Sequence, residues 1–174
     1  MKNCFLSYHH DNDGHYVDEL RGLCVGKYLI DYSLKNDISH FTDDTIYKKI
    51  RDKLRRSSVT VILIGERTGD RMWIDREIWA SLRGYDHPYD WSRSFKPSGL
   101  LGIYLPEDSL CVPDRLKDNI ESGYAVTMKW RNVERDLEKK VELAALNRST
   151  KRHLIRNGRM RMDDNYSRFL GFRF

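Results

Sequence analysis

One segment, Ser58-Val59-Thr60-Val61-Ile62-Leu63-Ile64-Gly65, decides the fold. Its side chains are apolar at almost every successive position and rich in β-branched residues, which favours a strand that is buried on both faces. Strands of this kind lie inside sheets that helices cover on two sides. The segment therefore predicts the central strand of an α/β domain.

Four weaker runs of strand length lie on either side of this segment, at residues 4–8, 28–31, 100–105 and 125–130. Stretches with helical periodicity separate them, near residues 16–24, 43–56 and 72–83 and after residue 113, and a last one follows Asn132. Strands that alternate with helices are typical of βαβ units in a parallel sheet. We therefore expect a flavodoxin-like three-layer fold, with a five-stranded parallel sheet in the order 2-1-3-4-5 and helices on both faces.

The composition is that of a globular domain. Apolar residues make up 40% and charged residues 33% of the 174 residues, which allows one core under a well-solvated surface. No apolar run approaches the roughly 20 residues that a membrane span needs, and the N-terminus turns polar too early for a signal peptide. The three cysteines lack the spacing of a zinc site or a disulfide framework. We expect a cytoplasmic protein with no membrane association and no bound metal.

The net charge of +5 is concentrated at the C-terminus. Residues 148–174 contain eight Lys and Arg against two Asp, a net charge of +6, so residues 1–147 are close to neutral. The predicted organisation is a domain over residues 1–147 and a basic extension, residues 148–174, that is dispensable for the fold. A basic tail differs from a basic binding face, so a solvated or docked terminal segment is favoured over nucleic-acid binding.

In a sheet of order 2-1-3-4-5, a ligand crevice forms at the carboxyl ends of the first and third strands. Residues 7–13, 31–33 and 65–77 would line it. The third strand lacks the terminal aspartate of a phosphoacceptor site. The turn after the first strand, residues 9–14, is bulky and anionic, unlike the Gly-rich loops that bind FMN or dinucleotide phosphates. This turn, interpreted as a polar loop, contains metal-ligand types but no second ligand set at a metal-site spacing.

Glu77 is the candidate catalytic residue. The buried stripe of the helix predicted over residues 72–83 consists of Ile74, Ile78 and Leu82. Glu77 lies at the edge of this stripe, one turn beyond Trp73 on the same side, so a carboxylate and an indole face one place. Helix geometry alone favours a simpler interpretation, a boundary glutamate paired with Arg71 or Arg76 beside a core tryptophan.

Five segments together resemble the bacterial TIR-like family over about residues 3–145. They are Phe5-Leu6-Ser7-Tyr8-His9, Asp31-Tyr32-Ser33, residues 58–65, Arg71-x-Trp73-x-x-x-Glu77-Ile78 and Gly99-Leu100-Leu101-Gly102-Ile103. Within that family the chain is similar to the TIR proteins of Thoeris antiphage systems. The resemblance implies a flavodoxin-like fold and, for the enzymatic members, cleavage of the nicotinamide–ribose bond of NAD to give cyclic or other ADP-ribose signals.

The resemblance also implies roles for individual residues. The family's catalytic glutamate, in a Trp-x-x-x-Glu arrangement, corresponds to Glu77 with Trp73. The residues implied in substrate binding are Ser7, Tyr8, His9, His10, Asp31, Ser33 and Trp73. Some TIR enzymes carry Arg after the opening Ser-Tyr pair, where this chain has His9 and His10. NAD is the implied substrate, so no separate cofactor is expected.

Two functions stay open at this point. The first is an NAD glycohydrolase or ADP-ribose cyclase in bacterial antiviral defence, whose product signals to a separate effector protein. A single carboxylate suits this chemistry, because nicotinamide leaves as a neutral molecule and the oxocarbenium ion needs only nearby negative charge. The second is a non-catalytic interaction module that acts through TIR–TIR contacts, which would also make the protein a homo-oligomer.

Overall fold

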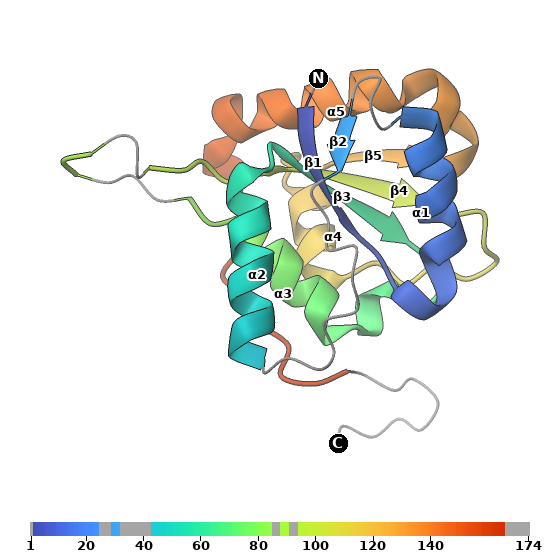
Figure 1. Ribbon diagram of the computed structural model, residues 1–174, viewed down its shortest axis with the longest axis horizontal. Helices are drawn as coiled ribbons and strands as arrows, with labels where there is room; N and C mark the ends of the chain where they lie inside the picture. The colour runs from blue at the N-terminus through green and yellow to red at the C-terminus, as the bar shows by residue number, and fades with distance from the viewer. Residues whose placement is uncertain (1, 25–28, 32–42, 85–87, 91–93, 166–174) are drawn as a thin grey trace.

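The computed structural model describes residues 2–24, 29–31, 43–84, 88–90 and 94–165 (Figure 1). The sheet consists of β1 (Lys2–Ser7), β2 (Leu29–Asp31), β3 (Val59–Ile64), β4 (Gly99–Tyr104) and β5 (Val126–Lys129). The strands lie in the order β2-β1-β3-β4-β5, each parallel to its neighbour. The predicted α/β class and the all-parallel sheet are confirmed.

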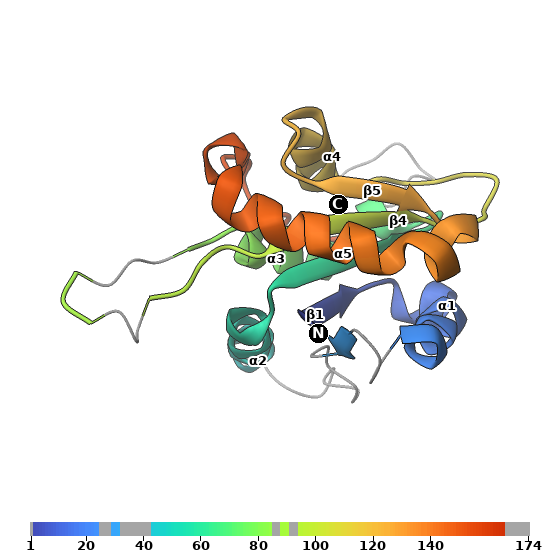
Figure 2. The ribbon, with the colours of Figure 1, turned by 90° about the horizontal axis from the view of Figure 1, so that it is seen from above.

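Helices cover both faces of this sheet. The α-helices of the described residues are α1 (His10–Cys24), α2 (Asp43–Arg56), α3 (Met72–Ser81), α4 (Asp114–Glu121) and α5 (Val133–Thr150). Short 3-10 turns are η1 (Thr68–Asp70), η3 (Trp130–Asn132) and η4 (Arg152–Leu154). Figure 2 shows α2, α3 and α4 in a row, with α3 in the middle and α1 well apart from them.

Alternation along the strands divides the core between the two faces. Leu6 of β1 and Val61 of β3 belong to the cluster that α1 and α5 cover. Ile62 of β3 belongs to the cluster beneath α3 and α4, and Phe5 of β1 packs with the apolar face of α2. Every residue of β3 is buried, because successive side chains point to opposite faces and both faces are covered. This confirms the interpretation of the central segment.

The prediction for the turn after β1 was wrong. Residues 9–14 were expected to form a polar loop before a helix near residue 16, but α1 begins at His10. Asp11 and Asp13 stand in its first turn, where a carboxylate interacts favourably with the positive end of the helix dipole. The N–H of Asp13 donates to the carbonyl of His9 at 2.8 Å and closes this turn. The anionic residues that suggested a loop are therefore a helix start.

The C-terminal segment also differs from its expectation. The proposed boundary between residues 147 and 148 falls inside α5, which continues to Thr150. Residues 156–165 then lie against α3 and α4 and hydrogen-bond to both helices. These contacts argue against an extension that is dispensable for the fold. Within the described residues, none of the helices combines the length and apolar character that crossing a membrane requires.

Candidate active site

The structure joins the end of β1 to α3 through one short hydrogen bond. Ser7 is the last residue of β1 and pairs in register with Ile62, so its side chain points to the sheet face that α3 covers. The Ser7 hydroxyl donates to Oε2 of Glu77 at 2.5 Å. Ser7 is almost fully buried and Glu77 is half-buried. Two of the predicted site residues, 70 positions apart in sequence, are thus in direct contact.

The Glu77 carboxyl group has no cationic partner among the described residues. Burial raises the pKa of its carboxyl group to about 7, and the hydrogen bond from Ser7 acts in the opposite direction. Among the described residues, neither Arg71 nor Arg76 forms an ion pair with Glu77. Arg76 instead lies over the Trp73 ring and donates to the Met162 carbonyl. The ion pair of the simpler interpretation is therefore not formed.

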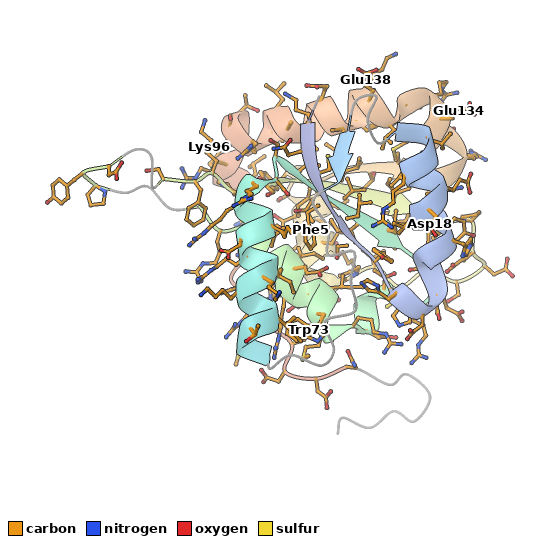
Figure 3. All side chains as sticks on the ribbon, in the orientation of Figure 1. Phe5, Asp18, Trp73, Lys96, Glu134 and Glu138 are labelled. Atoms are coloured by element: carbon orange, nitrogen blue, oxygen red, sulfur yellow. The ribbon has the colours of Figure 1, made fainter. Side chains whose placement is uncertain are left out.

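Trp73, at the start of α3, is a half-buried packing residue. It is partly buried against the cluster formed by Phe5 and the apolar face of α2. The guanidinium carbon of Arg76 lies 5.1 Å from the centroid of the indole ring. Figure 3 shows Trp73 at the beginning of α3, beside α2 and on the same side of the sheet as Phe5. The indole therefore contributes to packing between α3 and α2.

The other predicted binding residues are more scattered. Tyr8 follows Ser7 and therefore packs on the opposite face, against the cluster of α1 and α5. Its ring centroid lies 4.3 Å from that of His10, the exposed first residue of α1. Asp31 ends β2 and pairs in register with Cys4, so its backbone lies beside the middle of β1 and not beside Ser7 at the carboxyl end. Ser33 lies outside the described residues.

His9 is brought into a positively charged setting that sequence reasoning missed. Its side chain is buried, and Nδ1 has no hydrogen-bond partner within the described part of the chain. Burial and the positive charge of Arg71 lower the pKa of His9. Nε of Arg71, the residue before α3, is likewise buried and unpaired among described residues. Sequence reasoning gave Arg71 no anion-binding role, although a cation at a helix start is compatible with one.

A second missed feature is a pair of carboxylates at the end of β3. Asp13 is buried, and both of its oxygens lack a partner within the described residues. Burial, followed by the charge of Glu107, raises the pKa of Asp13 to about 6. A Cβ atom on Gly65 would lie 2.9 Å from Oδ1 of Asp13 and 3.0 Å from Oε2 of Glu107, so this glycine leaves room for both. The Glu66 N–H donates to the same Glu107 oxygen at 2.5 Å.

The larger described cavities lie elsewhere. One of about 600 Å³ is formed by α4 and residues 155–159, and one of about 420 Å³ lies between η1, the start of α4 and residues 159–162. Neither is lined by Ser7 or Glu77. The unpaired carboxylate, and not the size of a hollow, therefore identifies the candidate active site.

The fold and site together define a class of protein: a doubly wound α/β domain with a half-buried glutamate, unpaired with any described cation, beside the carboxyl end of its first strand. Comparison with known families is more specific. Residues 5–109 match the family described as "Thoeris protein ThsB, TIR-like domain", which is more than half of the chain, and the chain belongs to this family. The match includes every predicted site residue and ends before α4, β5, α5 and the C-terminal segment.

One solved structure is similar in overall shape. It is "FerB - flavoenzyme NAD(P)H:(acceptor) oxidoreductase (FerB) from Paracoccus denitrificans", with 16% sequence identity, 85% of this chain and 97% of that chain covered, and a TM-score of 0.49. Similarity at this level carries no argument about function.

Proposed function

We propose that the protein is a TIR-like NAD-cleaving enzyme, an NAD glycohydrolase or ADP-ribose cyclase, with Glu77 as its catalytic residue. The observation that carries the proposal is the Glu77 carboxyl group, which is half-buried, held by Ser7 and unpaired with any described cation. Removing a carboxylate from water without a neutralising partner lowers the stability of the folded protein. Carboxylates in such surroundings are found mainly at functional sites, where the reaction needs them. Membership of the Thoeris TIR-like family supports the same conclusion.

The proposed reaction breaks the bond between the ribose C1′ and the nicotinamide nitrogen. The bonding electron pair goes to the pyridinium nitrogen, so nicotinamide leaves as a neutral molecule without a general acid. The Glu77 carboxylate stabilises the positive charge that develops on the ribose, and the Ser7 hydroxyl fixes the carboxylate in place. Water, or a nucleophilic atom of the same ADP-ribose unit, then attacks C1′. The choice between them decides whether the product is linear or cyclic.

We assign the diphosphate of NAD to His9 and Arg71. The His9 side chain is buried, Arg71 is half-buried, and each presents a buried nitrogen without a partner among the described residues. The charge of Arg71 acts on His9, so the two groups lie near one another, and Arg71 directly precedes the helix that carries Glu77. A guanidinium at a helix N-terminus is well suited to a phosphate group. Tyr8, His10, Asp31, Ser33 and Trp73 remain proposed binding residues.

The proposed biological role is a step in antiviral defence. In this account the ADP-ribose-derived product is a signal, and a separate effector protein receives it. Contacts between copies of the TIR-like domain would bring active sites together and regulate turnover. A cytoplasmic location fits this role, because NAD is an intracellular metabolite.

The experiment is incubation of the purified protein with NAD, with nicotinamide release followed by chromatography and the second product identified by mass spectrometry. The proposal predicts stoichiometric nicotinamide together with an ADP-ribose-derived product. Measurement over a range of protein concentrations tests whether assembly activates turnover. Absence of nicotinamide at every concentration, in protein that binds NAD or self-associates, would instead support the interaction module.

A further inference from the structure

Helix α3, which carries Glu77, is held from the outside by residues 156–165. We propose that these residues form a strap that positions α3, with Arg115 and Asp75 as its buried anchor and Asn157 and Asn165 as its positioning residues. The role in positioning Glu77 rests on the proposed function, whereas the hold on α3 does not. Figure 1 shows the red C-terminal segment passing α2 and α3 on its way to the bottom of the view.

The anchor is a fully buried arginine. The side chain of Arg115 in α4 is 0% exposed, and its Nε lies 2.9 Å from Oδ1 of Asp75 in α3. Its five N–H groups all find acceptors, because Asp75 takes two bonds and the strap takes the other three. The three strap acceptors are Oδ1 of Asn157 and the carbonyls of Arg159 and Met160. A buried ion pair needs this complete set of partners to be tolerated.

The strap also binds α3 directly, at both ends of the helix. The Met162 N–H donates to Oδ2 of Asp75 at 2.9 Å, and Nδ2 of Asn157 donates to the Trp79 carbonyl at 3.1 Å. Arg161 lies over the Trp79 ring, 4.7 Å from its centroid. At the start of the helix, the Met72 N–H donates to Oδ1 of Asn165 at 2.9 Å.

This last contact supplies what the helix itself lacks. Arg71 occupies the N-cap position of α3 and makes no side-chain capping bond. The first N–H groups of a helix have no partner inside it, so Asn165 of the strap acts as the cap. A helix of ten residues depends on such tertiary contacts for its stability.

The strap and the proposed active site lie on different sides of the same helix. Asp75 and Glu77 are two residues apart, about 200° around a helix with ~100° per residue. Asp75 therefore faces α4 and the strap, while Glu77 faces Ser7 at the end of β1. The helix is fixed between them, so loosening the strap frees the helix to move Glu77 relative to Ser7.

The test uses three single variants of the full chain: Asn157→Ala and Asn165→Ala in the strap, and Asn147→Ala in α5 as the matched control. Asn147 and Asn157 both donate Nδ2 to a backbone carbonyl, but Asn147 bonds Tyr124, before β5, whereas Asn157 bonds Trp79 of α3. Asn165 is exposed, so its variant tests the strap even where the more buried Asn157→Ala fails to fold. Hydrogen exchange of residues 72–82 is compared with exchange in α1, which carries none of the three substitutions, together with kcat and KM for NAD.

We expect amide exchange in residues 72–82, relative to α1, to accelerate by about tenfold or more in both strap variants and to stay unchanged in Asn147→Ala. We also expect kcat to fall by about 5–10-fold with KM within twofold, since substrate binding is retained while the carboxylate is misplaced. Unchanged exchange in α3 overturns the strap. Faster exchange with full kcat overturns the positioning role. A wild-type protein that does not cleave NAD defeats the proposed function, and exchange alone then decides the strap.

Discussion

At the scale of single residues, the account depends on Ser7 and Glu77. The hydroxyl and the carboxylate come from segments 70 positions apart and meet at 2.5 Å. Burial disfavours the charged form of this carboxyl group and raises its pKa to about 7, and no described cation offsets that effect. The ionised carboxylate therefore lowers the stability of the folded protein. Two predictions follow from this cost, one on activity and one on stability.

The pH dependence of NAD cleavage should report the ionisation of Glu77. The charged carboxylate is the form that stabilises the developing cation, so kcat/KM should rise with pH and level off above an apparent pKa near 7. The measurement is the initial rate of nicotinamide release from pH 5.5 to pH 9 at low NAD. A profile that is already flat at pH 5.5 would show that Glu77 ionises as an ordinary carboxyl group.

Replacing Glu77 with Gln should stabilise the protein at high pH. The pKa of Glu77 is raised from 4.5 to about 7 in the folded state. Between these two pH values the folded state keeps a proton that the unfolded state has lost. The free energy of unfolding therefore falls as pH rises from about 4.5 through about 7. Glu77→Gln removes this loss. Above pH 7.5 the free energy of unfolding of the variant should exceed that of the wild type by at most about 3 kcal/mol, at about 1.36 kcal/mol per pKa unit. This difference should shrink towards pH 5. Denaturant unfolding of both proteins at pH 5 and pH 8 checks this, and an equal difference at the two pH values would contradict it.

At the scale of secondary-structure elements, α3 connects the site to three neighbours. Its inner face packs on the sheet through Ile74 and Ile78, and its start lies against α2 through Trp73. Its outer side is bound by residues 156–165. A substitution in α3 therefore affects both packing and the site, and each prediction needs a control that separates the two.

Trp73→Ala should lower both stability and substrate affinity. The indole is partly buried in the cluster of Phe5 and α2, so we expect a loss of about 2–3 kcal/mol, less than for a fully buried Trp. We also expect a several-fold rise in KM for NAD, since a flat wall of the crevice is removed. Ile46→Ala in the same cluster is the control and should lower stability without changing KM. An unchanged KM for Trp73→Ala would make Trp73 a packing residue only.

Arg71→Ala should weaken NAD binding with little effect on stability. The Arg71 Nε is buried without a partner among described residues, so its removal leaves no acceptor unsatisfied in the free protein. Loss of a phosphate contact should raise KM by about tenfold or more while kcat changes less. Arg67→Ala is the control, since Arg67 affects His9 less than Arg71 does. An equal rise in KM for the two substitutions would indicate that NAD responds to the general positive charge of this region, and not to a direct contact with Arg71.

At the scale of the whole molecule, the C-terminal segment is part of the fold. Truncation after Thr150 would remove the three strap acceptors of Arg115 and the cap on α3. We expect the free energy of unfolding of the truncated chain to fall by on the order of 3 kcal/mol or more, because three N–H groups of the buried Arg115 lose their acceptors. Thermal unfolding of the two forms measures this. A melting temperature within about 2 °C of the full chain would contradict it.

The sequence predicted those features that follow from local pattern. The burial of β3 follows from its unbroken apolar run. The rule that ligands bind at the carboxyl ends of parallel strands predicted one crevice for Ser7 and Glu77, but not the hydrogen bond between them. Side-chain partners far apart in sequence could not be found this way. Asp75 and Arg115 are 40 positions apart, and nothing in either segment specifies the other. The start of α1 was missed because Asp and Asn occur both in turns and in first helical turns.

The central claim is that Glu77 is the catalytic residue, and nicotinamide release by Glu77→Gln tests it most directly. The amide keeps the size of the side chain and can still hydrogen-bond Ser7, but it carries no charge. Wild-type and variant protein are compared at pH 8 with saturating NAD, after both are shown to unfold cooperatively. The account predicts a loss of about 10²-fold or more in kcat for a variant at least as stable as the wild type. Turnover close to wild type in the folded variant would contradict it.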